Sequence, residues 1–127
     1  MLKEITQQYQ NIVSQSMTGT ATITSAVTDI RFKDSVSIQL QWTGTPVGTF
    51  YIEGSVDHFP VAMQSNGIPN AGTWIPIALS IPLTATGSES QALLDLNQLS
   101  FPYIRVRYVN TSGTGTLNGF IFGKSLG

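Results

Sequence analysis

The chain has 127 residues with a formal net charge of −1; 10% of its residues are charged and none is cysteine. These values exclude disulfides, thiolate metal sites and a cysteine nucleophile, and they exclude a general electrostatic grip on nucleic acid or on an anionic membrane. Hydrophobic residues make up 41% of the chain, enough for the packed core of one domain, and the 28 threonines and serines supply a polar surface of hydroxyl groups.

Residues 1–16 differ from the rest of the chain because neither glycine nor proline interrupts them. Their apolar residues lie near helical spacing. No apolar run follows the lysine, so we expect no signal peptide, and no stretch has the ~20 apolar residues of a membrane helix. We interpret residues 1–16 as an N-terminal arm, either partly helical or a first strand, ahead of a β-sandwich domain over residues 17–127. The arm is predicted to contact a partner through Leu2, Ile5, Tyr9, Ile12 and Val13.

Short strands and turn signals alternate after residue 17, with one or two strands expected within residues 18–33. The clearest strand covers residues 35–42, where apolar residues alternate with serine and glutamine. This period of two predicts one buried and one solvated face, and it places Trp42 in the core. Pro46 and two glycines then form a turn, after which residues 49–55 return as a strand. We predict that these two strands form a hairpin.

Residues 56–73 form the longest irregular stretch, punctuated by prolines and glycines. Loops of this length are usually functional or disordered, and the apolar residues here argue against disorder. Two interpretations stay open: the loop folds back and caps one end of the sandwich, or its apolar residues are buried by another protein chain. The residues concerned are Phe59, Val61, Met63 and Ile68.

Residues 74–83 carry apolar residues at every second position, with Pro76 and Pro82 on the opposite face. Proline removes a donor from the hydrogen-bond ladder, so we predict an edge strand or a bent one. Trp74 begins this strand out of register with its apolar face. We expect Trp74 to be half exposed and to contact a partner or a ligand.

The last strands are predicted at residues 92–99, 103–109 and 116–123, with a hairpin turn at residues 111–115. Arg105 and Arg107 share one strand face with Tyr103. This face is either a contact strip for an acidic partner or a glycan, or an ordinary solvated sheet face whose arginines pair with cross-strand acids such as Glu53.

The sequence therefore predicts about eight strands with no helix between them. Strands without crossover helices pair mainly antiparallel, and two packed sheets follow. We predict an all-β, antiparallel two-sheet β-sandwich, either a jelly roll or another Greek key. The residues predicted to be buried between the sheets are Val36, Ile38, Leu40, Phe50, Ile52, Ile77, Leu79, Ile104, Val106 and Ile121.

Few residues suit catalysis. His58 is the only histidine, and the seven acidic residues are scattered along the chain. One histidine with scattered carboxylates cannot build a histidine-rich metal site, and the sequence lacks nucleophile-elbow, phosphate-loop, dinucleotide and calcium-loop motifs. We expect no enzyme activity, no cofactor and no bound metal.

Two stretches resemble small β-sandwich proteins of tailed bacteriophages and other bacterial viruses. They are residues 41–57, QWTGTPVGTFYIEGSVD, and residues 94–124, LDLNQLSFPYIRVRYVNTSGTGTLNGFIFGK. Some members of that group are head decoration or cement proteins. The likeness lies in strands and turns, and it transfers no functional residue because the group shares no active site.

The resemblance implies a structural role in the virion, after assembly in the host cytoplasm. The partners it implies are the major capsid protein or other virion proteins, with further copies of the chain in a homo-oligomer. A capsid decoration or cement protein is the first expectation. The alternative is a tail or fibre component with a carbohydrate- or receptor-binding β-sandwich module.

Overall fold

A computed structural model of the chain describes residues 6–19, 22–31, 33–58, 71–79, 83–87, 90–97 and 99–125. Within these ranges the chain forms ten strands and no helix. The strands are Thr6–Thr18 (β1), Thr22–Thr24 (β2), Thr28–Asp29 (β3), Ser35–Trp42 (β4), Val47–Ser55 (β5), Ile75–Pro76 (β6), Leu83–Thr86 (β7), Gln91–Asn97 (β8), Tyr103–Ser112 (β9) and Thr114–Ser125 (β10).

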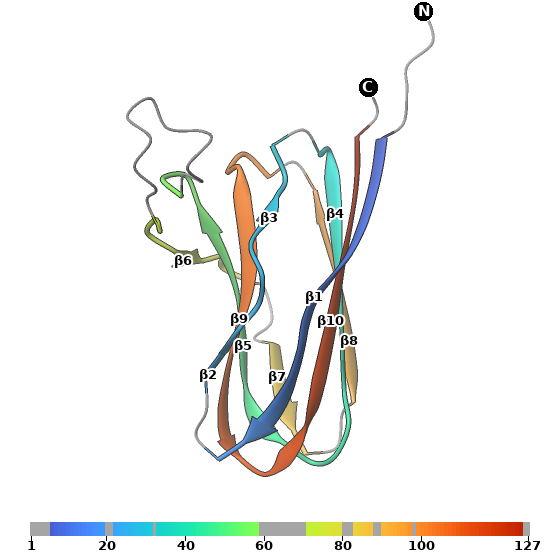
Figure 1. Ribbon diagram of the computed structural model, residues 1–127, viewed down its shortest axis with the longest axis vertical. Coiled ribbons are helices and arrows are strands. Elements are labelled where there is room, and N and C mark those ends of the chain that lie inside the picture. The colour runs from blue at the N-terminus through green and yellow to red at the C-terminus, as the bar shows by residue number, and fades with distance from the viewer. Residues whose placement is uncertain are drawn as a thin grey trace, which may run out of the picture.

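The strands form two antiparallel sheets packed face to face, as Figure 1 shows. The four-stranded sheet has the order β1-β10-β4-β8. The second sheet has the order β2-β9-β5-β6, with β3 paired to β9 and β7 paired to β5. The predicted all-β two-sheet sandwich is confirmed. The sequence left a jelly roll and another Greek key as alternatives, and the observed strand order is that of a jelly roll.

The two sheets can be described as one long sheet folded in half. β1, β10, β4 and β8 lie side by side in one sheet, and their chain neighbours β2, β9, β5 and β7 lie in the same order in the other. In each of these four pairs, the end of the first strand and the start of the second lie toward the same end of the sandwich, at the bottom of Figure 1. The predicted hairpins at residues 43–48 and 111–115 are therefore wrong, because β4 and β5, like β9 and β10, belong to different sheets.

Glycines with positive φ explain how the chain makes these crossings. Gly44 and Gly113 have φ values of 76° and 77°. A Cβ on Gly44 would overlap the carbonyl oxygen of Thr114, and a Cβ on Gly113 would overlap that of Thr45. The two crossings thus lie against each other, where the Thr45 amide donates to the Thr114 carbonyl oxygen at 3.1 Å. The same glycines that indicated a hairpin serve to turn the chain from one sheet into the other.

The N-terminal segment forms part of the sandwich over residues 6–16. β1 pairs with β10 along its whole length, with a β-bulge between Asn11 and Val13. Successive strand residues normally point to opposite faces, but the bulge lets Ile12 and Val13 both enter the core, each 6% exposed. This bulge explains why the adjacent apolar residues Ile12 and Val13 depart from the alternation of a regular strand. Leu2 and Ile5 lie outside the described residues.

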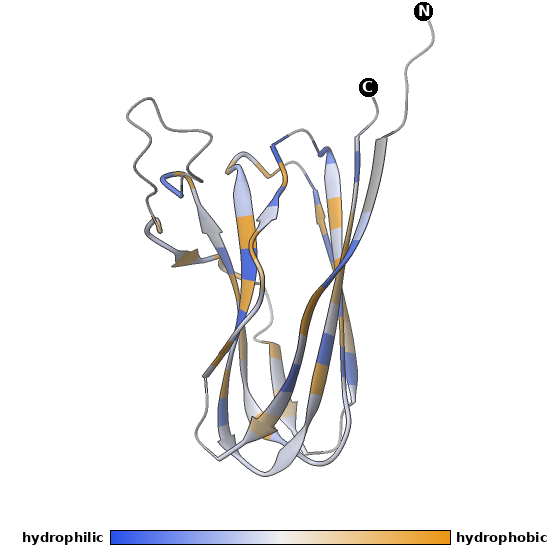
Figure 2. Ribbon diagram, in the orientation of Figure 1, coloured by the Kyte–Doolittle hydropathy of each residue, from blue (hydrophilic) through white to orange (hydrophobic). Residues whose placement is uncertain are grey.

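The core lies between the sheets and follows the predicted alternation, as the banding of the strands in Figure 2 shows. Trp42 is 4% exposed and packs on Phe50, so this pair joins the two sheets, with ring centroids 5.1 Å apart. Of the predicted core residues, Ile77 and Leu79 are only partly buried against the core. The buried ones are Val36, Ile38, Leu40, Phe50, Ile52, Ile104, Val106 and Ile121.

The strand predicted over residues 74–83 is interrupted. Its first part is only β6, at the edge of the second sheet as predicted. Pro76 has no amide hydrogen and ends the pairing, after which the Ile77 amide still donates to the Ile52 carbonyl oxygen at 2.7 Å. Ile75 was predicted on the apolar face, but it is 65% exposed because β6 lies beyond the cover of the four-stranded sheet.

Candidate interaction surfaces

The outer face of β9 carries the two predicted arginines, and both bind one buried carboxylate. Arg105 Nε donates to Glu53 Oε1, and Arg107 Nε donates to Glu53 Oε2, each at 2.9 Å. Glu53 lies on β5 directly opposite Arg105, and it is 3% exposed. The interpretation of cross-strand pairing with Glu53 is confirmed. The trio carries a net positive charge, because one carboxylate serves two guanidinium groups.

Aromatic rings cover the same two arginines. The Arg105 guanidinium carbon lies 4.4 Å from the centroid of the Trp74 ring, and that of Arg107 lies 4.3 Å from the Tyr51 ring. Both distances are within the range of a cation–π contact. The indole Nε1 of Trp74 donates to the Ala71 carbonyl oxygen at 3.0 Å, which fixes the ring. Trp74 is half-buried, and Arg105 occupies one side of its ring, so the ring is packed into the surface rather than presented as a free platform.

His58 lies on the same side of the molecule, and its ring contacts those of Trp74 and Tyr103. Its Nδ1 lies 3.0 Å from the Ala71 carbonyl oxygen, and its ring meets the Tyr103 ring edge-on at 4.9 Å. In the described part of the chain, no three His, Asp or Glu residues gather as a metal site requires. The described residues also include no helix long and apolar enough to cross a membrane.

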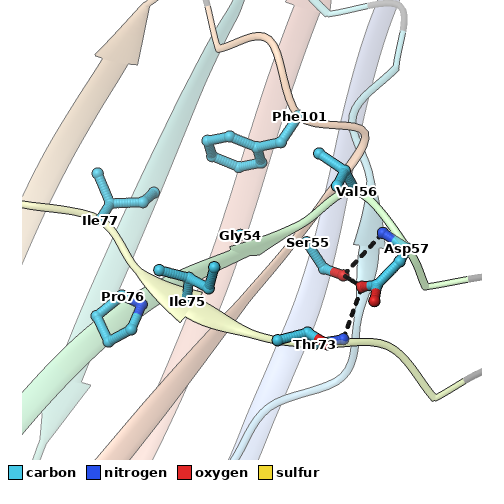
Figure 3. Close-up of a pocket in the computed structure, with 9 residues that line it drawn as sticks. All are labelled: Gly54, Ser55, Val56, Asp57, Thr73, Ile75, Pro76, Ile77 and Phe101. Carbon is cyan, nitrogen blue, oxygen red and sulfur yellow. Dashed lines mark hydrogen bonds between the residues drawn. The ribbon is translucent and has the colours of Figure 1, made fainter.

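An apolar groove lies where β5 ends and β6 begins, with a volume of about 360 Å³ (Figure 3). We call it the end groove. Phe101 lies flat over Gly54, where a Cβ would approach the Phe101 ring to 2.7 Å. Val56, 69% exposed, and Ile75 lie open to solvent along it. The groove is an extension of the sandwich interior that the four-stranded sheet does not cover. Its lining is Gly54, Ser55, Val56, Asp57, Thr73, Ile75, Pro76, Ile77 and Phe101.

Asp57 connects the two strands that form the end groove. Its Oδ1 accepts hydrogen bonds from the Thr73 amide at 2.6 Å and from the Ser55 hydroxyl at 2.9 Å. These donors favour the ionised carboxylate, with the Thr73 amide contributing most, and they hold the pKa of Asp57 below its ordinary value. The arrangement fixes the start of residues 71–76 against the end of β5.

A second surface is the outer side of the four-stranded sheet, which we call the four-stranded face. Tyr9 on β1 stacks on Phe120 of β10, with centroids 5.7 Å apart and planes 14° apart. Tyr9 is 69% exposed, and Leu93 on β8 is 73% exposed. A shallow hollow of about 310 Å³ adjoins Leu93. The neighbouring residues on this face are mostly amides and hydroxyls, among them Ser35, Ser37, Gln39, Gln41, Gln91, Asn97 and Asn118.

The predicted contact residues fall into three groups in the structure. Tyr9 is exposed on the four-stranded face, whereas Ile12 and Val13 are core residues and do not reach the surface. Trp74, Arg105 and Arg107 come together around Glu53. The predicted residues outside the described part are Leu2, Ile5, Phe59, Val61, Met63 and Ile68.

Sequence reasoning missed Leu93 and Ile75 as surface residues. Leu93 is followed by Leu94, and in a strand one of two successive residues must face outward. That doublet was the signal for an exposed leucine. Ile75 gave no such signal, because its exposure depends on how far the opposite sheet extends.

Comparisons with known proteins give a likeness of fold. No family model matches the chain, and no curated protein matches it in sequence. The crystal structure of SPBc2 prophage-derived protein YomS is similar over 98% of each chain, with a TM-score of 0.55 and 8% identity. A structure from Bacillus endospore appendages, which form disulfide-linked pili, is similar over 100% of this chain and 93% of that one, with a TM-score of 0.51 and 13% identity.

Proposed function

We propose that the chain is a non-enzymatic structural protein of a bacteriophage particle and, within that class, a capsid decoration or cement protein that binds the major capsid shell. The observation that carries the proposal is where exposed apolar side chains gather. Of the five large hydrophobic residues most exposed in the described part, four lie on the two surfaces: Val56 and Ile75 at the end groove, Tyr9 and Leu93 on the four-stranded face. Exposed apolar side chains that gather on one surface mark sites that other proteins cover.

The fold likenesses support the proposal. One similar structure is a prophage-derived protein, and the other belongs to appendages described as pili. A subunit of this chain has to assemble by non-covalent contacts, because it has no cysteine with which to form the disulfide links of those pili. Buried apolar contacts are the main source of such association.

The alternative is a tail or fibre component that binds a carbohydrate or a receptor. The stacked pair of Tyr9 and Phe120 favours it, because an exposed aromatic ring is a surface on which a sugar can stack. The hollow at this pair holds only about 70 Å³, whereas ligand pockets usually have about 300–1,000 Å³. Trp74 adds nothing to this alternative, because Arg105 already covers one side of its ring.

The test is the occupancy of purified particles, measured by mass spectrometry as copies of this chain for each copy of the major capsid protein. A fixed ratio to the capsid protein is expected, with a strong loss for Val56→Ser combined with Ile75→Ser. Val47→Ser is the matched control, because Val47 is also exposed but lies outside both surfaces. A chain that is absent from heads and co-purifies with tails would establish the alternative instead.

A further inference from the structure

The four-stranded face carries apolar side chains, among them Tyr9 and Leu93, that are exposed in the described part of the chain. Its apolar residues occupy neighbouring positions in the register: Phe120 lies beside Gln39, and Leu93 lies on the other side of Gln39. In the next row, Phe122 pairs with Tyr9 and with Ser37. The face therefore has apolar residues on β1, β10 and β8, with the polar side chains of Ser37 and Gln39 on β4 between them.

Among the described residues of this face, one charge of each sign is present. Lys124 on β10 and Asp95 on β8 lie on opposite sides of β4, and both are exposed. Lys124 is level with Ser35 and Asn97, whereas Asp95 is level with Ser37. The two charges are thus offset by two residues along the strands, which is about 7 Å. A partner surface with charges of one sign is attracted by one of these residues and repelled by the other. A surface that carries one positive and one negative charge can pair with both Lys124 and Asp95.

We propose that the four-stranded face is a two-fold dimer interface with a second copy of this chain, the symmetry axis running along β4. A rotation about that axis exchanges β10 with β8, so Phe120 of each copy packs on Leu93 of the other. The same rotation sets Lys124 of each copy opposite Asn97 of the other copy. Asp95 of that other copy is two residues further along the same strand, within reach of the lysine side chain. Gln39 lies on the axis, where an amide can donate to and accept from its own counterpart.

The size of the face sets the strength of the dimer. With the axis along β4, the strands β10, β4 and β8 of the two copies overlap; eight residues by three strands span about 27 Å by about 14 Å, or roughly 400 Å² for each copy. A standard interface covers about 800 Å² on each partner. The dimer is therefore weak and forms with rising concentration, at micromolar levels or above. The inference does not depend on the proposed function, because the purified chain alone shows it.

The first experiment is sedimentation equilibrium of the purified chain between about 1 μM and about 1 mM, a range that brackets a weak dimer. We expect a monomer–dimer equilibrium. Leu93→Ser is expected to raise the dissociation constant at least about 30-fold, because symmetry places the substitution in the interface twice. Ile75→Ser is the matched control, since Ile75 is similarly exposed but lies in the end groove; it leaves the constant unchanged.

The second experiment tests the axis by exchanging charges. Lys124→Glu alone and Asp95→Lys alone each place like charges together and weaken the dimer, by several-fold at low salt. An equimolar mixture of the two variants pairs opposite charges again, so it forms a heterodimer at least as strong as the wild-type dimer. Circular dichroism verifies that each variant is folded.

Two results would overturn the proposal. A chain that stays monomeric up to about 1 mM shows that the face is covered by a different protein, or by nothing. A dimer that tolerates Leu93→Ser, or whose two charge variants fail to rescue each other, uses another surface or another axis.

Discussion

Replacing Glu53 by glutamine is the sharpest test of how the second sheet is held together. The change keeps the size of the side chain but removes the charge that binds Arg105 and Arg107, each at 2.9 Å. Breaking a fully buried ion pair costs about 3–5 kcal/mol. The two arginine side chains are 23% and 28% exposed, so water recovers part of that loss. We expect Glu53→Gln to lower the free energy of unfolding by about 1.5–3 kcal/mol.

Urea unfolding followed by circular dichroism measures this loss. Asp95→Asn is the matched control, because it removes an exposed carboxylate and should change stability by less than about 0.5 kcal/mol. In Glu53→Gln the two guanidinium groups repel each other, so about 1 M NaCl should recover part of the loss by screening. A loss below about 0.5 kcal/mol, or one that salt leaves unchanged, would refute the view that this carboxylate neutralises the arginines.

Three further predictions concern the turns, the core and the effect of acid. Gly113→Ala combines a positive φ with an overlap at the Thr45 carbonyl oxygen, so it should lower the free energy of unfolding by about 2–4 kcal/mol in thermal unfolding. Gly19 also has a positive φ but has open space around it, so Gly19→Ala should cost about 1 kcal/mol. Equal losses would contradict the close packing of the crossings. Leu40→Ala should cost about 2–5 kcal/mol by urea unfolding, because Leu40 is 0% exposed, and a loss under about 1 kcal/mol would show that the site is not core. The lowered pKa of Asp57 means that its contribution to stability is present above the ordinary value of 3.8 and disappears as the pH falls through the lower, folded-state pKa. Asp57→Asn should therefore be less stable than the wild type at neutral pH, and acid unfolding should show the difference shrinking as the pH falls below 3.8; a constant difference would show that the ionised carboxylate is not the cause.

The fold class was predictable because alternation is a local signal. Residues 35–42 and 103–109 show which side chains face the core without any knowledge of their neighbours in space. The pairing of Arg105 and Arg107 with Glu53 was likewise among the alternatives, since opposite charges on neighbouring strands attract. These inferences need only the period of two and the chemistry of the side chains.

The assignment of strands to sheets was not predictable, for a physical reason. A glycine with positive φ allows the chain to turn, but it does not decide whether the next strand pairs with the previous one or crosses to the other sheet. That choice depends on contacts such as Gly44 against Thr114, which are distant in sequence. The β1 segment was obscured in another way, because the bulge at Asn11 and Val13 breaks the period of two. The end groove, too, depends on where the opposite sheet stops.

The position of β10 has a consequence for how the protein is made. β10 is synthesised after the other nine described strands, yet it lies in the middle of the four-stranded sheet, between β1 and β4. While it is still inside the ribosome, β1 has no partner and one edge of β4 is open, so the nascent chain exposes unpaired backbone and apolar side chains that invite aggregation. The sandwich can therefore close only after β10 has left the ribosome, and its assembly depends on contacts between β1 and β10, which are far apart in the chain and form slowly.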